Sequence, residues 1–123
     1  MKNHFQVLIV GGGNAGISLA AQLFRKNPKL EIAIVDPAEK HYYQPAWTLV
    51  GAGVFDQKAT ERNQADVLPK KATWIKEAAQ TFEPDQNTLV TAGGHRYSYD
   101  YLVVCPGIQL DWHKIKGLEG NLG

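Results

Sequence analysis

The chain has 123 residues, of which 44% are hydrophobic, and this size suits one small globular domain with a modest core. Thirteen basic and twelve acidic residues leave a formal net charge of +1, so the composition predicts no nucleic-acid partner. The single cysteine, Cys105, excludes an internal disulfide and fits a reducing compartment. No apolar run approaches the ~20 residues that a membrane-spanning helix needs.

The first predicted elements are a strand at residues 5–10, a glycine turn at 11–16 and a helix at 17–24. The turn has the pattern GxGxxG. A second apolar run ends in Asp36, twenty residues after Gly16. This order is the fingerprint of a βαβ unit that binds a dinucleotide. The sequence therefore predicts a site for the adenosine half of FAD or NAD.

Each residue of this fingerprint has its own predicted role. Gly11 allows the tight turn, Gly13 lets the backbone approach a pyrophosphate, and Gly16 brings the helix close to the strand. The pyrophosphate is expected to face the free amides at the start of the helix, whose dipole favours negative charge. Asp36 is expected to accept a hydrogen bond from the ribose and to disfavour NADP, because its carboxylate repels a 2′-phosphate.

The helix is expected to face a sheet through four residues at helical spacing, namely Ile17, Ala20, Ala21 and Phe24. A second strand is predicted at 30–35, buried on both faces of a parallel sheet. Residues 39–56 have no clean period beyond a short helical turn at 47–51. Residues 58–69 are expected to be a loop with some helix.

From residue 73 the hydrophobic pattern has a period of two. Three strands of a β-meander are expected, at residues 74–82, 88–91 and 95–99. Residues 100–104 are predicted to form a further buried strand that rejoins the parallel sheet. The predicted fold class is therefore α/β, a Rossmann-like dinucleotide-binding domain with an inserted antiparallel meander.

This order of elements resembles the FAD-binding domain of the two-dinucleotide flavoprotein superfamily. The last strand of that domain usually ends in Ala-Thr-Gly beside the flavin nucleotide. Here it ends in Cys105-Pro106-Gly107, so the glycine alone matches. The stretch HYYQPAWTLVGAG at residues 41–53 is similar to the sulfide:quinone oxidoreductase family in particular. Four further stretches resemble that family, at residues 66–69, 74–76, 99–102 and 107–111.

The resemblance implies FAD as the cofactor and further residues that contact it. Asn14 and Ala15 would lie in the turn over the pyrophosphate. Asp36 takes the place of the ribose-binding acid, where Glu is more usual. Gln44 falls where the family contacts the flavin nucleotide, and Ala79 where backbone groups meet the adenine.

The resemblance covers the whole chain but only the N-terminal part of a family member. Residues 1–117 are assigned to the N-terminal part of the FAD-binding domain, and residues 118–123 to a linker toward downstream domains. The implied reaction is oxidation of sulfide, with FAD passing electrons to a membrane quinone. The redox cysteines and the apolar helices that hold the enzyme to a membrane would lie downstream. The chain alone is therefore expected to contain no catalytic residue and to be inactive.

Other residues receive plainer interpretations. Cys105 is expected to be an inert, buried thiol, because no partner cysteine exists. The four histidines are far apart and predict no metal site. Tyr42 is interpreted as core packing, whereas Trp47 fits packing and a wall beside the flavin or quinone equally well.

Two alternatives stay open at this point. One is a type II NADH:quinone dehydrogenase or another FAD-dependent disulfide oxidoreductase, although the Cys-x₄-Cys pair of a disulfide reductase is absent. The other is a nucleotide-binding module without activity. Such a module would expose apolar sheet surface and is expected to form a homodimer or to aggregate. The expected location is the cytoplasm, or the surface of a membrane for the full-length protein.

Overall fold

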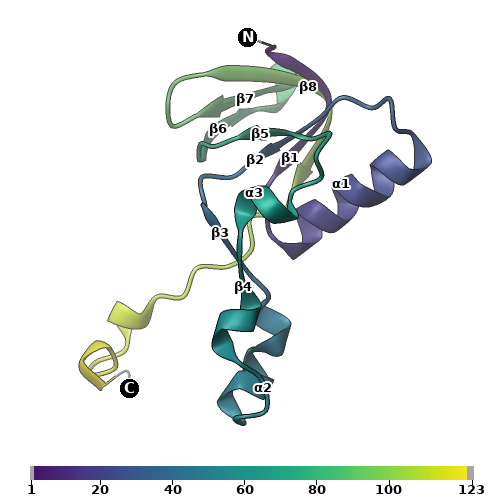
Figure 1. The fold of residues 1–123 in the computed structure, drawn as a ribbon. Helices are drawn as coiled ribbons and strands as arrows, with labels where there is room; N and C mark the ends of the chain where they lie inside the picture. Colours follow the sequence, from purple (N-terminus) through teal and green to yellow (C-terminus); the bar gives the residue numbers. More distant parts are fainter. Residues whose placement is uncertain (1, 122–123) are drawn as a thin grey trace.

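A six-stranded mixed sheet forms the body of the protein (Figure 1). The computed structural model describes residues 2–121. The strands are β1 (His4–Val10), β2 (Ile32–Val35), β5 (Thr73–Ile75), β6 (Ala79–Glu83), β7 (Thr88–Thr91) and β8 (Arg96–Val104). Their spatial order is β5-β2-β1-β8-β7-β6. Strands β5, β2, β1 and β8 are parallel, and β7 is antiparallel to both β8 and β6. The α/β fold class and its antiparallel meander are confirmed.

Helix α1 (Asn14–Lys26) covers one face of the parallel strands. Ile17, Ala20 and Phe24 pack there as predicted, but Ala21 does not belong to this cluster and Leu23 does. Successive residues of an α-helix are rotated by about 100° about the helix axis. Ala21 therefore lies about 100° from Ala20, outside the face that packs against the sheet. The buried Gly16 lies on the same face.

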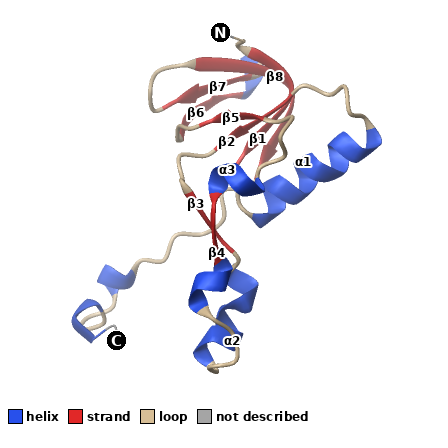
Figure 2. Cartoon of the chain, viewed as in Figure 1, coloured by secondary structure: helices blue, strands red, loops and turns tan. Residues whose placement is uncertain are grey.

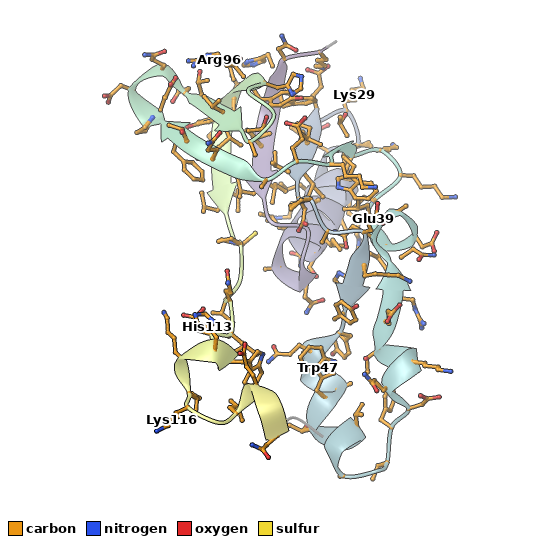
Figure 3. The ribbon with its side chains drawn as sticks, turned by 90° about the vertical axis from the view of Figure 1, so that its left-hand side faces the viewer. Lys29, Glu39, Trp47, Arg96, His113 and Lys116 are labelled. Carbon is orange, nitrogen blue, oxygen red and sulfur yellow. The ribbon has the colours of Figure 1, made fainter. Side chains whose placement is uncertain are left out.

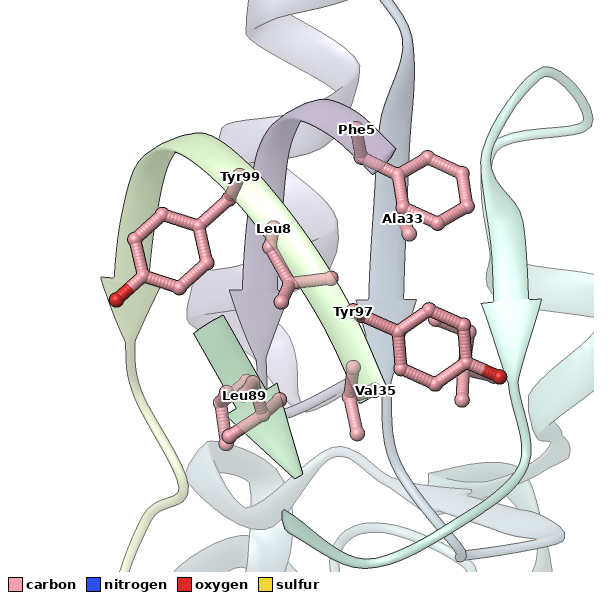
Figure 4. Close-up of a cluster of buried hydrophobic side chains, with 9 residues drawn as sticks. Phe5, Leu8, Ala33, Val35, Leu89, Tyr97 and Tyr99 are labelled. Carbon is pink, nitrogen blue, oxygen red and sulfur yellow. The ribbon is translucent and has the colours of Figure 1, made fainter. Parts of the chain in front are cut away.

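On the other face of the parallel strands, side chains of β1 and β2 form a buried cluster with side chains of the meander strands β7 and β8 (Figure 4). Phe5 and Leu8 of β1 contact side chains from β7 and β8, and the rings of Phe5 and Tyr97 lie 6.3 Å apart between centroids. Strand β2 contributes Ile32 and Ile34 to the α1 side and its other two residues to this side. All four residues of β2 are buried, which confirms a strand covered on both faces.

Two strand predictions are wrong in their boundaries. The stretch 74–82 is two strands, because β5 pairs with β2 at one edge of the sheet and β6 pairs with β7 at the other edge. The predicted strands at 95–99 and 100–104 are instead one strand, β8, which pairs with both β7 and β1. A period of two indicates extended backbone but does not identify the neighbouring strand.

A two-stranded antiparallel ribbon leaves the body beside the sheet (Figure 2). It consists of β3 (Lys40–Tyr42) and β4 (Glu61–Asn63), which were not predicted because these polar triplets show no apolar alternation. The ribbon carries the helices η1 (Gln44–Ala46), α2 (Trp47–Gly51) and η2 (Gln57–Thr60), and α3 (Gln64–Val67) follows it. The predicted helical turn at 47–51 is confirmed as α2.

The ribbon and its helices form one arm of the molecule, and the C-terminal segment forms a second arm that extends away from the sheet (Figure 1). It contains the short helices η4 (Trp112–Lys114) and η5 (Glu119–Asn121), and a further short helix, η3 (Pro84–Gln86), joins β6 to β7. The linker predicted at 118–123 includes η5, and its last two residues lie outside the described residues. No helix between residues 2 and 121 has the length and hydropathy needed to cross a bilayer.

Replacing Gly16 by alanine is expected to destabilise the fold strongly. The new Cβ would overlap the carbonyl oxygen of Gly11 and lie 3.2 Å from Ile9 Cγ2, so the helix would have to move off the sheet. We expect a loss of at least about 2 kcal/mol in the free energy of unfolding, measured by chemical denaturation. Gly51→Ala is the control, because nothing lies within 4 Å of its new Cβ. Equal stability of the two variants would contradict this account of the packing.

Candidate functional site

The start of α1 presents unpaired backbone amides. Gly13 is the N-cap residue, no side chain caps the helix, and no acidic residue lies in its first turn. The amide of Ile17 donates to the Gly13 carbonyl at 3.1 Å. The amides of residues 13–16 have no acceptor among the described residues. Free N–H groups and the positive end of the helix dipole make this turn suitable for an anion.

The three glycines of the motif are required for different reasons. Gly11 has a φ of +105°, and a Cβ there would overlap the backbone oxygen of Cys105. Gly16 packs against the backbone of Gly11. Gly13 has an ordinary φ of −75°, and a Cβ there would meet nothing within 4 Å. The described residues therefore give no reason for glycine at position 13, whereas a ligand lying against its backbone would.

Asp36 directly follows β2 and lies beside the glycine turn. Its Oδ2 accepts a hydrogen bond from the Gly12 amide at 2.6 Å, and its Oδ1 accepts one from the Ala38 amide at 2.7 Å. The Asp36 carbonyl also accepts a bond from Trp74 Nε1 at 2.8 Å. These hydrogen bonds stabilise the conformation of the turn. Because each carboxylate oxygen has a second lone pair, Asp36 can still accept a hydrogen bond from a ribose hydroxyl.

Gln64 was not identified by the sequence analysis. Its side chain is 1% exposed, and Nε2 donates to the Gly12 carbonyl at 2.7 Å. Gly12 is thus held at its N–H by Asp36 and at its C=O by Gln64. No local pattern signals this contact, because Gln64 follows Gly12 by 52 residues. The helical turn α3 also contains the acidic Asp66, so its pattern of polar and apolar residues does not single out Gln64.

A cleft of about 880 Å³ opens in front of the glycine turn. It is lined by the turn, by the arm that the ribbon carries and by the start of the C-terminal arm. Figure 3 shows these two arms, with Trp47 on one and His113 on the other. Five residues predicted as cofactor contacts meet here, namely Gly13, Asn14, Ala15, Gln44 and Gly107.

The far end of the cleft is aromatic and apolar. Tyr42 and Trp47 meet edge to face with ring centroids 6.2 Å apart, and Ile108 and Leu110 line the cleft from the other arm. The Trp47 indole donates to Thr60 Oγ1 at 3.3 Å, which fixes its orientation. Tyr42 is 50% exposed and Trp47 43%, so the interpretation of Tyr42 as core packing is wrong. The ribbon carries both rings away from the core.

The remaining predicted contacts lie outside the cleft lining. Gly11 lies in the turn, and Gly16 lies behind it against the Gly11 backbone, so both glycines determine the conformation of the turn. Asp36 lies beside the turn and contacts Gly12. Ala79 begins β6, pairs with Thr91 and packs against the core cluster on the meander side. The structure therefore places Asp36 close to the turn. It places Ala79 on β6, the edge strand at the opposite side of the sheet from β5.

Cys105 lies at the end of β8, half-buried against the cluster on the α1 side. Burial raises the pKa of the Cys105 thiol. Its Sγ lies 3.8 Å from the Gly11 carbonyl oxygen. A protonated thiol is a weak nucleophile, and these surroundings support its interpretation as a small packing residue. In the described part of the chain, the His, Cys, Asp and Glu side chains form no group suited to a metal ion.

Comparison with known proteins identifies the family to which this chain is similar. Residues 5–123 match the pyridine nucleotide-disulphide oxidoreductase family. The mitochondrial sulfide:quinone oxidoreductase of Dictyostelium discoideum is 49% identical over 100% of this chain and 27% of its own length. The mitochondrial sulfide:quinone oxidoreductase of Mus musculus is 44% identical over 95% of this chain and 26% of its own length.

A solved structure gives the same picture in three dimensions. The X-ray structure of the sulfide:quinone oxidoreductase from the hyperthermophilic bacterium Aquifex aeolicus superposes with a TM-score of 0.75 at 32% identity. The match covers 89% of this chain and 25% of that protein. The chain therefore spans about a quarter of the length of the proteins that it resembles.

Proposed function

The chain belongs to the pyridine nucleotide-disulphide oxidoreductase family, and we propose that it is the part of a flavoprotein that binds FAD. The observation that carries this proposal is the open space at Gly13, beside unpaired helix amides and facing the cleft. A ligand that needs both a bare backbone and several N–H donors is a diphosphate. The residues present therefore fit the central part of a dinucleotide.

The two ends of the cofactor follow from the chemistry around the diphosphate. Asp36 is proposed to accept a hydrogen bond from the adenosine ribose, and its negative charge disfavours a 2′-phosphate. Ala79 is proposed to meet the adenine through its backbone, as the family resemblance implies. This contact needs no side-chain donor from β6, because it uses the backbone of Ala79.

The flavin end is assigned to the apolar part of the cleft. Tyr42, Trp47 and Ile108 offer flat and apolar surface suited to a fused aromatic ring. Gln44 supplies an amide that can donate to and accept from the polar edge of such a ring. Gly107, with a φ of +77°, lets the chain turn away from β8 without a side chain in the cleft.

When bound, FAD supplies a carrier that accepts and releases two electrons. The described residues would bind it and orient it. The α1 amides would hold its negative charge, and the two arms would shield one end of it from water. None of the described residues is proposed as a catalytic residue, because Cys105 has no second cysteine in this chain.

For the whole protein we propose oxidation of sulfide with a quinone as the electron acceptor. Support comes from two relatives of that name, which are 49% and 44% identical over nearly all of this chain. Type II NADH:quinone dehydrogenase and disulfide reductase activities are less well supported by these comparisons. Quinones dissolve in membranes, so we propose that the whole protein works at a membrane surface. Both relatives are named as mitochondrial.

Replacing Gly13 by alanine is expected to remove the flavin without unfolding the protein. The new Cβ meets no protein atom within 4 Å, but it would occupy the surface where the diphosphate lies. We expect at least a tenfold loss of FAD affinity, or about 1.4 kcal/mol, with an unchanged melting temperature. Titration of the apoprotein with FAD, followed by fluorescence, measures this loss.

The matched control for this experiment is Gly120→Ala, which also places a Cβ in open space but lies outside the cleft. It should bind FAD like the wild-type protein. Equal FAD affinity of the two alanine variants would show that the diphosphate does not lie against Gly13.

Activity of the whole protein separates the proposed reaction from its alternatives. We expect sulfide-dependent reduction of a soluble quinone, and little reduction when NADH replaces sulfide. The measurement is quinone absorbance under anaerobic conditions, with flavin reduction followed in the same sample. Quinone reduction that depends on NADH and ignores sulfide would contradict the proposed reaction but not the proposed FAD site.

A further inference from the structure

The second glycine of the motif, Gly12, is held by two side chains from distant parts of the chain. Asp36 Oδ2 accepts a hydrogen bond from the Gly12 N–H at 2.6 Å, and Gln64 Nε2 donates one to the Gly12 carbonyl oxygen at 2.7 Å. A Cβ on Gly12 would overlap Gln64 Nε2 and lie 3.1 Å from Asp36 Oδ2. Gly12 must therefore be glycine so that both side chains can reach its backbone.

These two bonds fix the peptide planes on either side of Gly12. No peptide bond between described residues is cis. In a trans peptide the C=O and N–H of one unit point in opposite directions. Because the Gly12 carbonyl points at Gln64, the Gly13 N–H of the same unit points away from Gln64. Gly12 is buried while Gly13 is exposed and lines the cleft, so that direction leads out of the protein body.

We propose that Gln64 is a positioning residue that aims the Gly13 amide at the diphosphate of the bound dinucleotide. This inference rests on the proposed function, since it assigns a role within the same site. Gln64 acts only through Gly12 and is not itself proposed to touch the cofactor.

The surroundings of Gln64 keep its side chain in place. Its backbone amide donates to the Glu39 carbonyl at 2.8 Å, and its carbonyl accepts from the Leu68 amide at 3.1 Å. The side chain is almost fully buried, so water does not compete for the Gly12 carbonyl. Without the amide donor, the Gly12 carbonyl would be buried and unpaired, and its peptide would be free to turn toward another donor.

The test uses two substitutions at Gln64 in the whole protein. Gln64→Met keeps the length of the side chain and removes the donor. Gln64→Glu keeps the shape and donates to the Gly12 carbonyl only when its carboxyl group is protonated. Burial and the nearby carboxylate of Asp36, together with the charges of Glu39 and Asp66 around α3, should raise the pKa of the new Glu.

The readout is the dissociation constant of FAD at several pH values. We expect Gln64→Met to bind FAD about tenfold to a hundredfold more weakly at every pH, because the misaligned Gly13 amide would lose its charge-assisted hydrogen bond to the diphosphate. Gln64→Glu should bind almost like the wild-type protein at low pH and lose affinity as the pH rises. Gln22→Glu, on the exposed side of α1, is the control and should follow the wild-type protein throughout.

A second pair of ligands separates positioning from general destabilisation. Binding of ADP should weaken in the Gln64 variants, whereas the weaker binding of adenosine, which has no diphosphate, should not change. Equal losses for the two ligands would assign Gln64 a structural role only, and unchanged FAD affinity in both Gln64 variants would overturn the inference outright. Failure of the wild-type protein to bind FAD would instead overturn the proposed function, and this inference with it.

Discussion

The close approach of three backbone segments at the glycine turn determines the rest of this structure. Gly11 lies against the carbonyl of Cys105 at the end of β8, and Gly16 lies against the carbonyl of Gly11. Side chains at these positions would push β1, α1 and β8 apart. Because the three elements meet so closely, the amides at the start of α1 emerge at the carboxyl edge of the parallel strands. Ligands of open α/β sheets bind at this edge.

Polarity changes across the cleft in a way that suits an extended, partly charged ligand. One end presents backbone amides and no acidic side chain from the first turn of α1. The other end presents Tyr42, Trp47 and the apolar start of the C-terminal arm. These walls are separate arms, and large apolar side chains on them, Val54 and Ile108 among them, are exposed. The cleft therefore has a polar end formed by backbone amides and an apolar end formed by exposed side chains of the two arms.

Sequence reasoning identified what is local and missed what depends on partners. The glycine motif, Asp36 and the buried run of β2 have short-range signatures that follow from turn geometry and strand burial. The split between β5 and β6 was missed because alternation does not name the neighbouring strand. Gln64 was missed because its contact with Gly12 joins elements far apart in the sequence. Tyr42 was misjudged because nothing in an aromatic side chain distinguishes a cleft wall from a core.

The central claim is that the amides opening α1 hold the diphosphate of FAD. A crystallographic or cryo-EM map of the whole protein with FAD bound tests this most directly. The account predicts phosphate oxygens about 3 Å from the amide nitrogens of residues 13–15, with the ligand resting on the bare Cα of Gly13. A map that places the diphosphate away from this turn, with the flavin held elsewhere, would contradict it.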